Sequence, residues 1–418
     1  MKKVKYLIVG AGISGLSFAS YVKDYLVLEK EHEVGGLCRT IKRNGYTWDY
    51  SGHFFHFKDS ELKKQFVETM PPEDIIVKEK NTKILFKDRL IDFPFQKNIH
   101  QLEQQDFIEC LYDLYFKEEK EQYQNFEEML YGKFGVSITE KFLKPYNEKL
   151  YACHLNTLEV NAMGRFFPYA DIKDIISNMK QTNNTSYNGV FLYPKEGAAS
   201  FIHQVYASLD PEKIWLNCEL LRVDKEEHVA YTTRGEISYE YLINTIPLDC
   251  FCKVMGDSHN GALTANKVLV FNIGFDKKSV NPDLHWLYFP EKKYNFYRVG
   301  FYDNILDQDR MSIYVEIGFS NQQRIDIDAE LKKTLQGLSE VGIVTDHQMV
   351  DYCSIVMNPA YVHVSEISER YKQGLFDQYA KYNVYSIGRY GKWTYCSIED
   401  CVLDARALAQ KMKENTDE

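Results

Sequence analysis

The sequence predicts a mixed α/β fold in which a parallel sheet of the Rossmann type is combined with a helical insertion and an antiparallel sheet. Three observations predict it. The first forty residues read as strand, glycine turn and helix; residues 100–180 carry apolar side chains at helical spacing; and residues 263–320 return to strand patterning. The expected domains are a discontinuous Rossmann-like domain (1–80, 190–250 and 380–418), a helical domain (98–180) and a sheet domain (81–97 and 251–379).

The N-terminal segment has the pattern of a dinucleotide-binding strand, turn and helix. An apolar run over residues 4–9 ends at the motif GAGISG, residues 10–15, and a helix-compatible segment follows. Gly10 suits the tight turn, Gly12 lets the backbone approach a pyrophosphate, and Gly15 lets helix and strand pack closely. The phosphates are therefore expected at the helix N-terminus, where free N–H groups face them.

An acidic residue follows the next apolar run at the spacing that this motif requires. The run YLVL, residues 25–28, ends at Glu29, about 20 residues beyond the turn. A carboxylate at that point accepts hydrogen bonds from ribose hydroxyls. A glycine motif alone is a weak signal, but here strand, helix and acid agree. The ligand is therefore expected to contain an adenosine ribose without a 2′-phosphate.

Composition and charge narrow the class of protein. The 418 residues have room for two or three packed units, and the net charge of −10 argues against nucleic acid or an anionic membrane as a partner. Nine cysteines without a CxxC pair favour free thiols in a reducing cytoplasm over a disulfide framework or a metal site. The chain enters a strand directly after MKK, so neither a signal peptide nor a membrane span is expected.

The run VGGLCRT, residues 34–40, distinguishes NAD from FAD. A second glycine pair after the ribose acid, followed by an arginine, resembles the extension found in amine oxidases, protoporphyrinogen oxidase and the UDP-galactopyranose mutases. The resemblance implies FAD, with Arg39 as a charge-assisted donor near the cofactor; the alternative is a solvated loop arginine. The cofactor-binding residues implied in this half of the chain are Gly10, Gly12, Ile13, Ser14, Gly15, Glu29, Lys30, Gly36, Leu37 and Arg39.

Two further segments resemble the flavin-binding parts of the UDP-galactopyranose mutases. The run SGHFFHF, residues 51–57, resembles the GxHxFH loop that lies against the isoalloxazine ring, which makes His53 and His56 candidate catalytic residues beside the flavin. Without that context, two histidines among phenylalanines would be read as buried core residues. Near the C-terminus, GRYGKWTY resembles the second flavin-binding motif and implies Gly388 and Arg389 as cofactor residues. In the family, backbone at the position of Val223 pairs with the adenine.

Arginine and tyrosine residues from distant segments of the chain are expected to bind the substrate. The passages LYFPE (287–291) and FYR (296–298) resemble the eukaryotic-type mutases, in which this arginine reaches the sugar-nucleotide pyrophosphate. A guanidinium offers forked donors that match phosphate oxygens, so Arg298 is a candidate catalytic and substrate-binding residue; the alternative is a surface strand arginine. Tyr361 and Tyr395 match the two tyrosines that bind phosphate in the family.

The segment PYNEKLY, residues 145–151, resembles the part of the mutases that borders the nucleotide base. It implies Tyr146 and Tyr151 as substrate residues, and Arg165 is a further candidate on the phosphate side. Two positions depart from the bacterial mutases: Tyr151 replaces a tryptophan and Ser397 replaces an aspartate. The base therefore stays open between uracil, thymine and guanine, and the sugar between galactose, an acetamido sugar and a deoxysugar.

Together the motifs identify an α/β protein with a Rossmann-like FAD-binding domain, a helical insertion and an antiparallel β-sheet substrate domain. The resemblance implies an isomerase in which N5 of reduced FAD attacks the anomeric carbon and converts a nucleotide-linked pyranose into a furanose, feeding cell-surface polysaccharide synthesis. It also implies a nucleotide-sugar substrate, an external reductant such as NAD(P)H and a homodimer. The alternatives are an FAD-dependent oxidoreductase of the amine oxidase or protoporphyrinogen oxidase type, and a non-catalytic flavin-bound scaffold.

Overall fold

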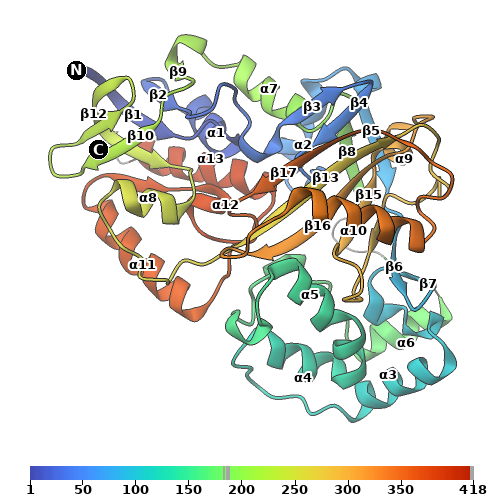
Figure 1. Cartoon of the computed structure of the whole chain (residues 1–418). Coiled ribbons are helices and arrows are strands. Elements are labelled where there is room, and N and C mark those ends of the chain that lie inside the picture. Colours follow the sequence, from blue (N-terminus) through green and yellow to red (C-terminus); the bar gives the residue numbers. More distant parts are fainter. Residues whose placement is uncertain (182–183, 185–188, 415–418) are drawn as a thin grey trace.

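The structure is a computed structural model that describes residues 1–181, 184 and 189–414 (Figure 1). The last four residues of the expected Rossmann-like domain lie outside the described residues. Two sheets of seven strands stand side by side, and a group of helices closes one end of the molecule. The mixed α/β fold predicted from the sequence is confirmed.

The first sheet carries the N-terminal motif. Its order is β10-β11-β12-β1-β2-β9, β18 also pairs with the C-terminal end of β12, and β1 pairs in parallel with both β12 and β2. Helices α1 and α13 pack against each other over the face of β1 that carries Tyr6 and Ile8. Leu7 and Val9, on the opposite face, pack into a second cluster, so the central strand is buried on both faces, as parallel strands are. The strands are β1 (Lys2–Val9), β2 (Tyr25–Leu28), β9 (Ile214–Trp215), β10 (Leu220–Asp224), β11 (Val229–Thr232), β12 (Gly235–Asn244) and β18 (Val384–Ser386).

The second sheet has the order β17-β13-β16-β15-β14-β6-β7. It contains the hairpin expected near residues 81–95, but it is not antiparallel throughout, because β6 pairs with β14 in parallel. These two strands come from distant parts of the chain, and no hairpin turn fixes their relative direction. The strands are β6 (Thr82–Phe86), β7 (Arg89–Asp92), β13 (Asn266–Phe275), β14 (Trp286–Tyr288), β15 (Arg298–Phe301), β16 (Ser312–Ser320) and β17 (Met349–Met357).

Helices form the third part of the molecule and cover the sheets. The helical segment comprises α3 (Gln104–Phe116), α4 (Phe126–Ile138), α5 (Lys144–Tyr151) and α6 (Ile172–Lys180). The remaining helices are α1 (Ile13–Tyr21), α2 (Ser60–Glu68), α7 (Ala199–Ala207), α8 (Leu248–Val254), α9 (Tyr302–Leu306), α10 (Ile327–Glu340), α11 (Glu366–Ala380), α12 (Gly388–Gly391) and α13 (Ile398–Glu414). Two small sheets pair β3 (Thr40–Arg43) with β4 (Tyr46–Asp49), and β5 (Ile75–Glu79) with β8 (Val190–Pro194).

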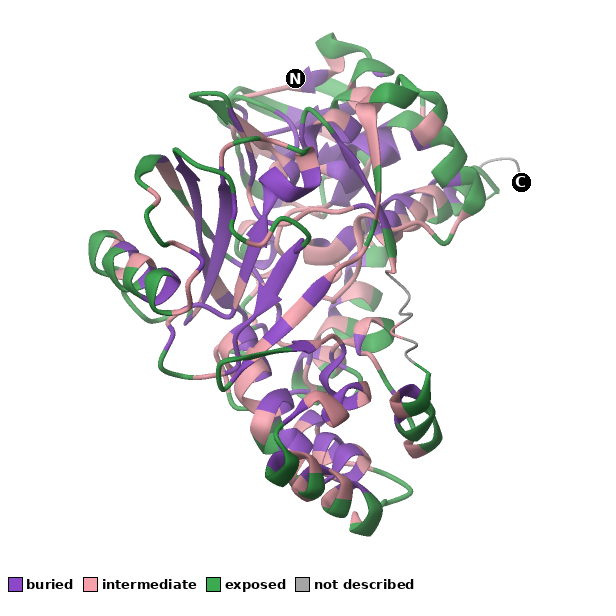
Figure 2. Cartoon of the chain, turned by 90° about the vertical axis from the view of Figure 1, so that its right-hand side faces the viewer, coloured by how far each residue is buried: buried purple, intermediate pink, exposed green. Residues whose placement is uncertain are grey.

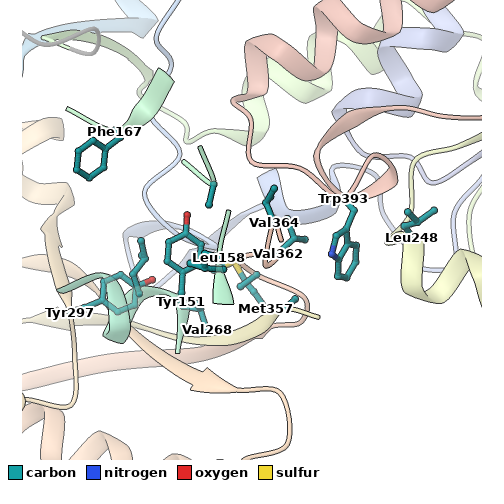
Figure 3. Close-up of a cluster of buried hydrophobic side chains, with 14 of the residues drawn as sticks. Tyr151, Leu158, Phe167, Leu248, Val268, Tyr297, Met357, Val362, Val364 and Trp393 are labelled. Atoms are coloured by element: carbon teal, nitrogen blue, oxygen red, sulfur yellow. The ribbon is translucent and has the colours of Figure 1, made fainter. Parts of the chain in front are cut away.

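One hydrophobic core joins the three parts. Figure 2 shows buried residues concentrated in the strands and on the inner sides of the helices. One cluster includes Leu7 of the first sheet, Ile84 and Val268 of the second, and Phe126 and Leu150 of the helices. Figure 3 shows part of it, in which Tyr151 and Val268 lie between Phe167 on one side and Trp393 on the other. Among the described residues, no helix is both long and apolar enough to cross a bilayer.

Candidate functional site

A cavity of about 910 Å³ opens where the first sheet, the second sheet and the helices meet. Residues that directly follow β1, β2 and β12 line it, namely Gly10, Glu29 and Thr245. Ligands of open α/β sheets bind in the crevice outside the carboxyl ends of the strands. The position of this cavity therefore fits a bound dinucleotide.

The glycines of the N-terminal motif have distinct packing environments. Gly10 has a φ of +103°, and a Cβ there would lie 2.5 Å from Thr245 Oγ1; a Cβ on Gly15 would lie 2.0 Å from the carbonyl oxygen of Gly10. Gly12 lines the cavity, yet no described atom lies within 4 Å of where its Cβ would be. Gly12 is also the N-cap of α1, and no described side chain caps this helix. The free N–H groups of the first turn thus remain available to a diphosphate.

The carboxylate of Glu29 is fixed at the cavity wall. Its Oε2 accepts a hydrogen bond from the Ala11 N–H at 2.8 Å, and its Oε1 accepts one from the Glu31 N–H at 3.0 Å. Each oxygen keeps a lone pair for a further donor, as binding of ribose hydroxyls requires. Ile13, Ser14, Lys30, Gly36 and Leu37 line the cavity around this carboxylate.

Arg39 also lines the cavity and is anchored in its loop. Its Nε donates to the Gly36 carbonyl at 2.8 Å, its Nη1 lies 3.2 Å from Glu33, and the guanidinium lies 4.8 Å from the centre of the Tyr50 ring. Only 15% of the side chain is exposed. These contacts argue against a freely solvated arginine.

Two buried nitrogens face this region without a partner among the described residues: Nδ1 of His53 and Nε of Arg389. Burial, together with the nearby Arg389 charge, lowers the pKa of His53 to about 4, so its ring is neutral at pH 7. The Arg389 guanidinium donates to the Cys396 carbonyl at 3.1 Å and lies 4.6 Å from the centre of the Tyr395 ring. Because an unpaired buried polar group is costly, both positions fit a polar ring system such as the implied flavin.

His56 lies on the same loop and has a backbone partner. Its Nδ1 lies 3.1 Å from the Val190 carbonyl, and burial lowers its pKa to about 4. Neither loop histidine carries a charge at neutral pH. Both can therefore act there only as neutral hydrogen-bonding groups.

Arg298 is held by a buried acidic residue that the sequence reasoning missed. Its Nε and Nη2 donate to the two carboxylate oxygens of Glu316 at 2.7 and 2.6 Å, and the two residues are cross-strand partners on β15 and β16. Glu316 is 1% exposed and also accepts a hydrogen bond from the Ser51 hydroxyl, which ties it to the His53 loop. The sequence did contain a signal for this residue, namely one acid in the otherwise apolar run IYVEIGF. An acid in a buried strand needs a cationic or hydrogen-bonding partner, which here is Arg298.

Tyr361 and Tyr395 share the cavity with Arg298. Their rings stack with centres 5.8 Å apart and an interplanar angle of 18°. Burial raises the pKa of Tyr361 above its ordinary value, so its hydroxyl keeps its proton and can donate. Tyr146 also lines the cavity and packs edge-on against Tyr288, with ring centres 5.3 Å apart. The structure thus brings one arginine and three tyrosines from four chain segments together.

Arg165 lines the cavity but is engaged with acidic residues near the start of α13. Its Nη2 lies 2.7 Å from Asp400 and 3.6 Å from Glu399, and it donates to the Ser397 hydroxyl at 3.3 Å. Sequence reasoning missed both acids, which look like ordinary first-turn residues of a helix.

Four predicted residues do not line the cavity. Gly15 and Gly388 act through close packing, since a Cβ on Gly388 would lie 2.1 Å from Ser14 Oγ. Val223 is buried in the β10–β11 pair. Tyr151 is fully buried, with its ring centre 5.8 Å from that of Tyr361. Its ring lies in the core next to a tyrosine of the cavity wall, and its contact with the nucleotide base stays a prediction.

Comparisons with known proteins agree with this architecture. A family model described as an NAD(P)-binding Rossmann-like domain matches residues 8–69. The structure superimposes on that of a reduced UDP-galactopyranose mutase with a TM-score of 0.92 and 22% identity, covering 100% of this chain and 95% of the other. A candidate protoporphyrinogen oxidase from Exiguobacterium sp. 255-15 gives 0.79 and 17%, covering 99% of each chain.

A more distant similarity extends to amine oxidases. Cyclohexylamine oxidase from Brevibacterium oxydans IH-35A gives a TM-score of 0.69 with 11% identity, over 98% of this chain and 99% of the oxidase. The matches thus cover the whole length of the chain and rank the mutase structure above both oxidases in TM-score. The resemblance to the UDP-galactopyranose mutases that the motifs indicated is therefore confirmed at the level of the fold.

Proposed function

We propose that the protein is a flavin-dependent mutase that interconverts the pyranose and furanose forms of a nucleotide-diphosphate sugar of the UDP-galactose type. The observation that carries the proposal is that Arg298, Tyr361 and Tyr395 line one cavity together with the glycine motif and His53. A reaction that expels a diphosphate needs cationic and hydroxyl donors at that place. The full-length similarity to a mutase structure supports the same conclusion.

The cavity walls suit FAD as the cofactor. The N-terminus of α1 and Gly12 would hold its diphosphate, Glu29 its ribose, and His53 and Arg389 its ring. When bound in the reduced state, FAD supplies the nucleophilic N5 for the anomeric carbon of the sugar. The proposal includes an external reductant such as NAD(P)H and a role in cell-surface polysaccharide synthesis.

The chain's own residues bind and stabilise the leaving diphosphate. Glu316 fixes the fork of Arg298, so the guanidinium needs no reorganisation when negative charge grows on the phosphate oxygens. Tyr361 and Tyr395 add hydroxyl donors from the adjacent wall. Because the site is partly enclosed by aromatic side chains, these interactions are stronger than they would be in water.

The second candidate is an oxidoreductase in which oxidised flavin accepts a hydride. The observation in its favour is the aromatic wall of the cavity, where Phe54 and Trp286 stack with ring centres 5.1 Å apart. The two oxidase structures share the fold, which keeps this candidate open. Such an enzyme would have little use for an arginine fixed by a buried glutamate beside two tyrosine hydroxyls.

A panel of nucleotide sugars tests the proposal. The dithionite-reduced protein is incubated without oxygen with UDP-, dTDP- and GDP-linked hexoses, and the products are separated and examined by NMR. We expect a furanose from at least one of them, and that one identifies the base and the sugar. Turnover only with oxidised flavin and oxygen would support the oxidoreductase, and no turnover in either state would support a scaffold.

A further inference from the structure

Two cysteine thiols lie together in the wall of the cavity. Cys396 Sγ and Cys401 Sγ are 3.7 Å apart, both thiols are free, and both residues line the cavity. Cys396 directly follows Tyr395 and is half-buried, whereas Cys401 lies in the first turn of α13 and is 6% exposed. A small molecule in the cavity can therefore reach a pair of thiols that are already in contact.

The surroundings of Cys401 favour its thiolate. Its sulfur is in hydrogen-bonding contact with the Cys396 thiol, the Arg389 backbone N–H and the Ser14 hydroxyl, and these contacts lower the pKa of Cys401 although its burial acts in the opposite direction. The N-terminal end of α13 and the nearby Arg389 guanidinium favour negative charge at the same place. By contrast, burial raises the pKa of Cys38, a third thiol of the cavity, to about 12. Cys401, which lies at the N-terminal end of α13, is therefore taken as the attacking thiol.

We propose that Cys396 and Cys401 form a reversible redox pair that small disulfides of the glutathione type oxidise, and that its disulfide form binds the nucleotide substrate more weakly. The Cys401 thiolate attacks one sulfur of the small disulfide and releases one thiolate. Cys396 then attacks the mixed disulfide, which closes the 396–401 bond and releases the second thiol. The protein loses two hydrogens as two thiols become one disulfide, and the small disulfide is reduced to two thiols, so the step balances.

The effect on binding follows from the neighbours of Cys396. Closing the bond moves the two sulfurs from 3.7 Å to bonding distance, and we infer that the segment that carries Cys396 shifts with its sulfur. That segment includes Tyr395, and the Cys396 carbonyl accepts a hydrogen bond from Arg389 at 3.1 Å. Tyr395 is an expected contact of the substrate, and Arg389 is an expected contact of the flavin ring. This second half of the inference rests on the proposed function, whereas formation of the bond does not.

Mass spectrometry tests formation of the bond. The flavin-loaded protein is incubated with oxidised glutathione, remaining thiols are alkylated, and the protein is digested with trypsin. Residues 393–406 form one tryptic peptide that contains both cysteines, because cleavage follows Lys392 and Arg406. We expect this peptide without alkyl groups and two hydrogens lighter than the dithiol form, and dithiothreitol should reverse the change. A dialkylated peptide, with glutathione on the exposed Cys250 instead, would overturn the inference.

Variants and a binding measurement complete the test. Cys396→Ser should abolish the lighter peptide and leave glutathione on Cys401, whereas Cys250→Ser should behave like the unmodified protein. Calorimetric titration with UDP should show about tenfold weaker binding after oxidation, recovered with dithiothreitol, because one phosphate contact is lost. Unchanged UDP affinity in the fully oxidised protein would refute the link to the site. If UDP fails to bind the reduced protein, the nucleotide assignment of the proposed function is wrong, and the peptide mass still decides the redox pair.

Discussion

At the scale of single residues, the chemistry of the site depends on pairs that fix one another. The Arg298 guanidinium can bind a diphosphate only if it is correctly oriented. Glu316 holds it in that orientation by accepting two hydrogen bonds from it across the β15–β16 pair. The arginine was predictable from its motif. Its partner was not, because the pairing of β15 with β16 brings together residues that are 18 positions apart in the chain.

Replacing Arg298 with lysine should separate binding of the leaving group from binding of the cofactor. Arg298→Lys keeps a charge opposite Glu316 but removes the fork, so we expect turnover to fall on the order of 100-fold. The flavin absorbance of the purified protein should be unchanged. Arg310→Lys is the matched control, because Arg310 stacks on Tyr46 away from the cavity. Loss of the flavin from Arg298→Lys would mean that this side chain faces the cofactor and not the substrate.

Tyr151 and Tyr361 provide a second contrast. The Tyr151 hydroxyl is buried without a hydrogen-bond partner among the described residues. Removing it in Tyr151→Phe should leave the free energy of unfolding unchanged or raise it by up to about 1 kcal/mol, with no change in UDP affinity. Tyr361→Phe should weaken UDP binding about tenfold, because a donor to phosphate is lost. Weaker UDP binding by Tyr151→Phe would show that the Tyr151 hydroxyl takes part in substrate binding.

At the scale of elements, the strand, turn and helix at the N-terminus were the most predictable part of the molecule. Local sequence determines most of that unit, since Gly15 is required by a contact within the unit, and Gly10 is required by its positive φ and by its contact with Thr245 after the neighbouring strand. The parallel pairing of β6 with β14 was not predictable, because alternation identifies a strand without giving its partner or direction. The acids that pair with Arg165 were not predictable either, because they belong to a helix more than 230 residues further along the chain.

Two glycine variants should separate cofactor binding from packing within this strand, turn and helix. Gly12→Ala adds a methyl group where no described atom lies within 4 Å, so the apo-protein should keep its Tm within about 2 °C while cofactor affinity falls at least about tenfold. Gly15→Ala places the methyl group 2.0 Å from the Gly10 carbonyl oxygen, so it should lower the Tm of the apo-protein by several degrees or more. Thermal scans and flavin titrations measure both. Equal effects of the two variants would contradict the assigned roles.

At the scale of the whole molecule, one core joins both sheets and the helices, and the cavity lies where they meet. Full-length similarity to known structures is consistent with this shared core. The fold class followed from periodicity and motifs. The convergence of Arg298, Tyr361 and Tyr395 could be predicted only from the resemblance to the mutases. These residues lie on different segments of the chain, and no local sequence pattern shows that the segments meet in space.

Buried histidines should make the protein sensitive to acid. Burial lowers the pKa of His53, His56 and His285 from 6.5 to about 4. Between pH 4 and 6.5 the unfolded chain therefore binds more protons than the folded one, and stability falls as the pH drops, by about 1.4 kcal/mol per pH unit for each histidine. Burial also raises the pKa of two carboxyls, that of Asp49 from 3.8 to about 6 and that of Asp303, and these two groups act in the opposite sense.

Urea unfolding at several pH values between 5 and 7 checks this expectation. His56→Asn keeps a donor for the Val190 carbonyl but does not titrate, so it should flatten the slope by up to about 1.4 kcal/mol per pH unit, with the largest effect near pH 5. His32→Asn is the control, because 74% of the His32 side chain is exposed. The same slope in both variants would show that His56 is accessible to protons in the folded state.

The central claim is that the flavin takes part in turnover without a net change of redox state. The most direct test follows the flavin absorbance of the dithionite-reduced protein, without oxygen and after excess reductant is removed, while furanose formation is measured by NMR in the same sample. We expect many equivalents of furanose per protein while the absorbance stays that of reduced flavin. Oxidation of the flavin in step with substrate consumption, or product only after oxygen is admitted, would contradict the account.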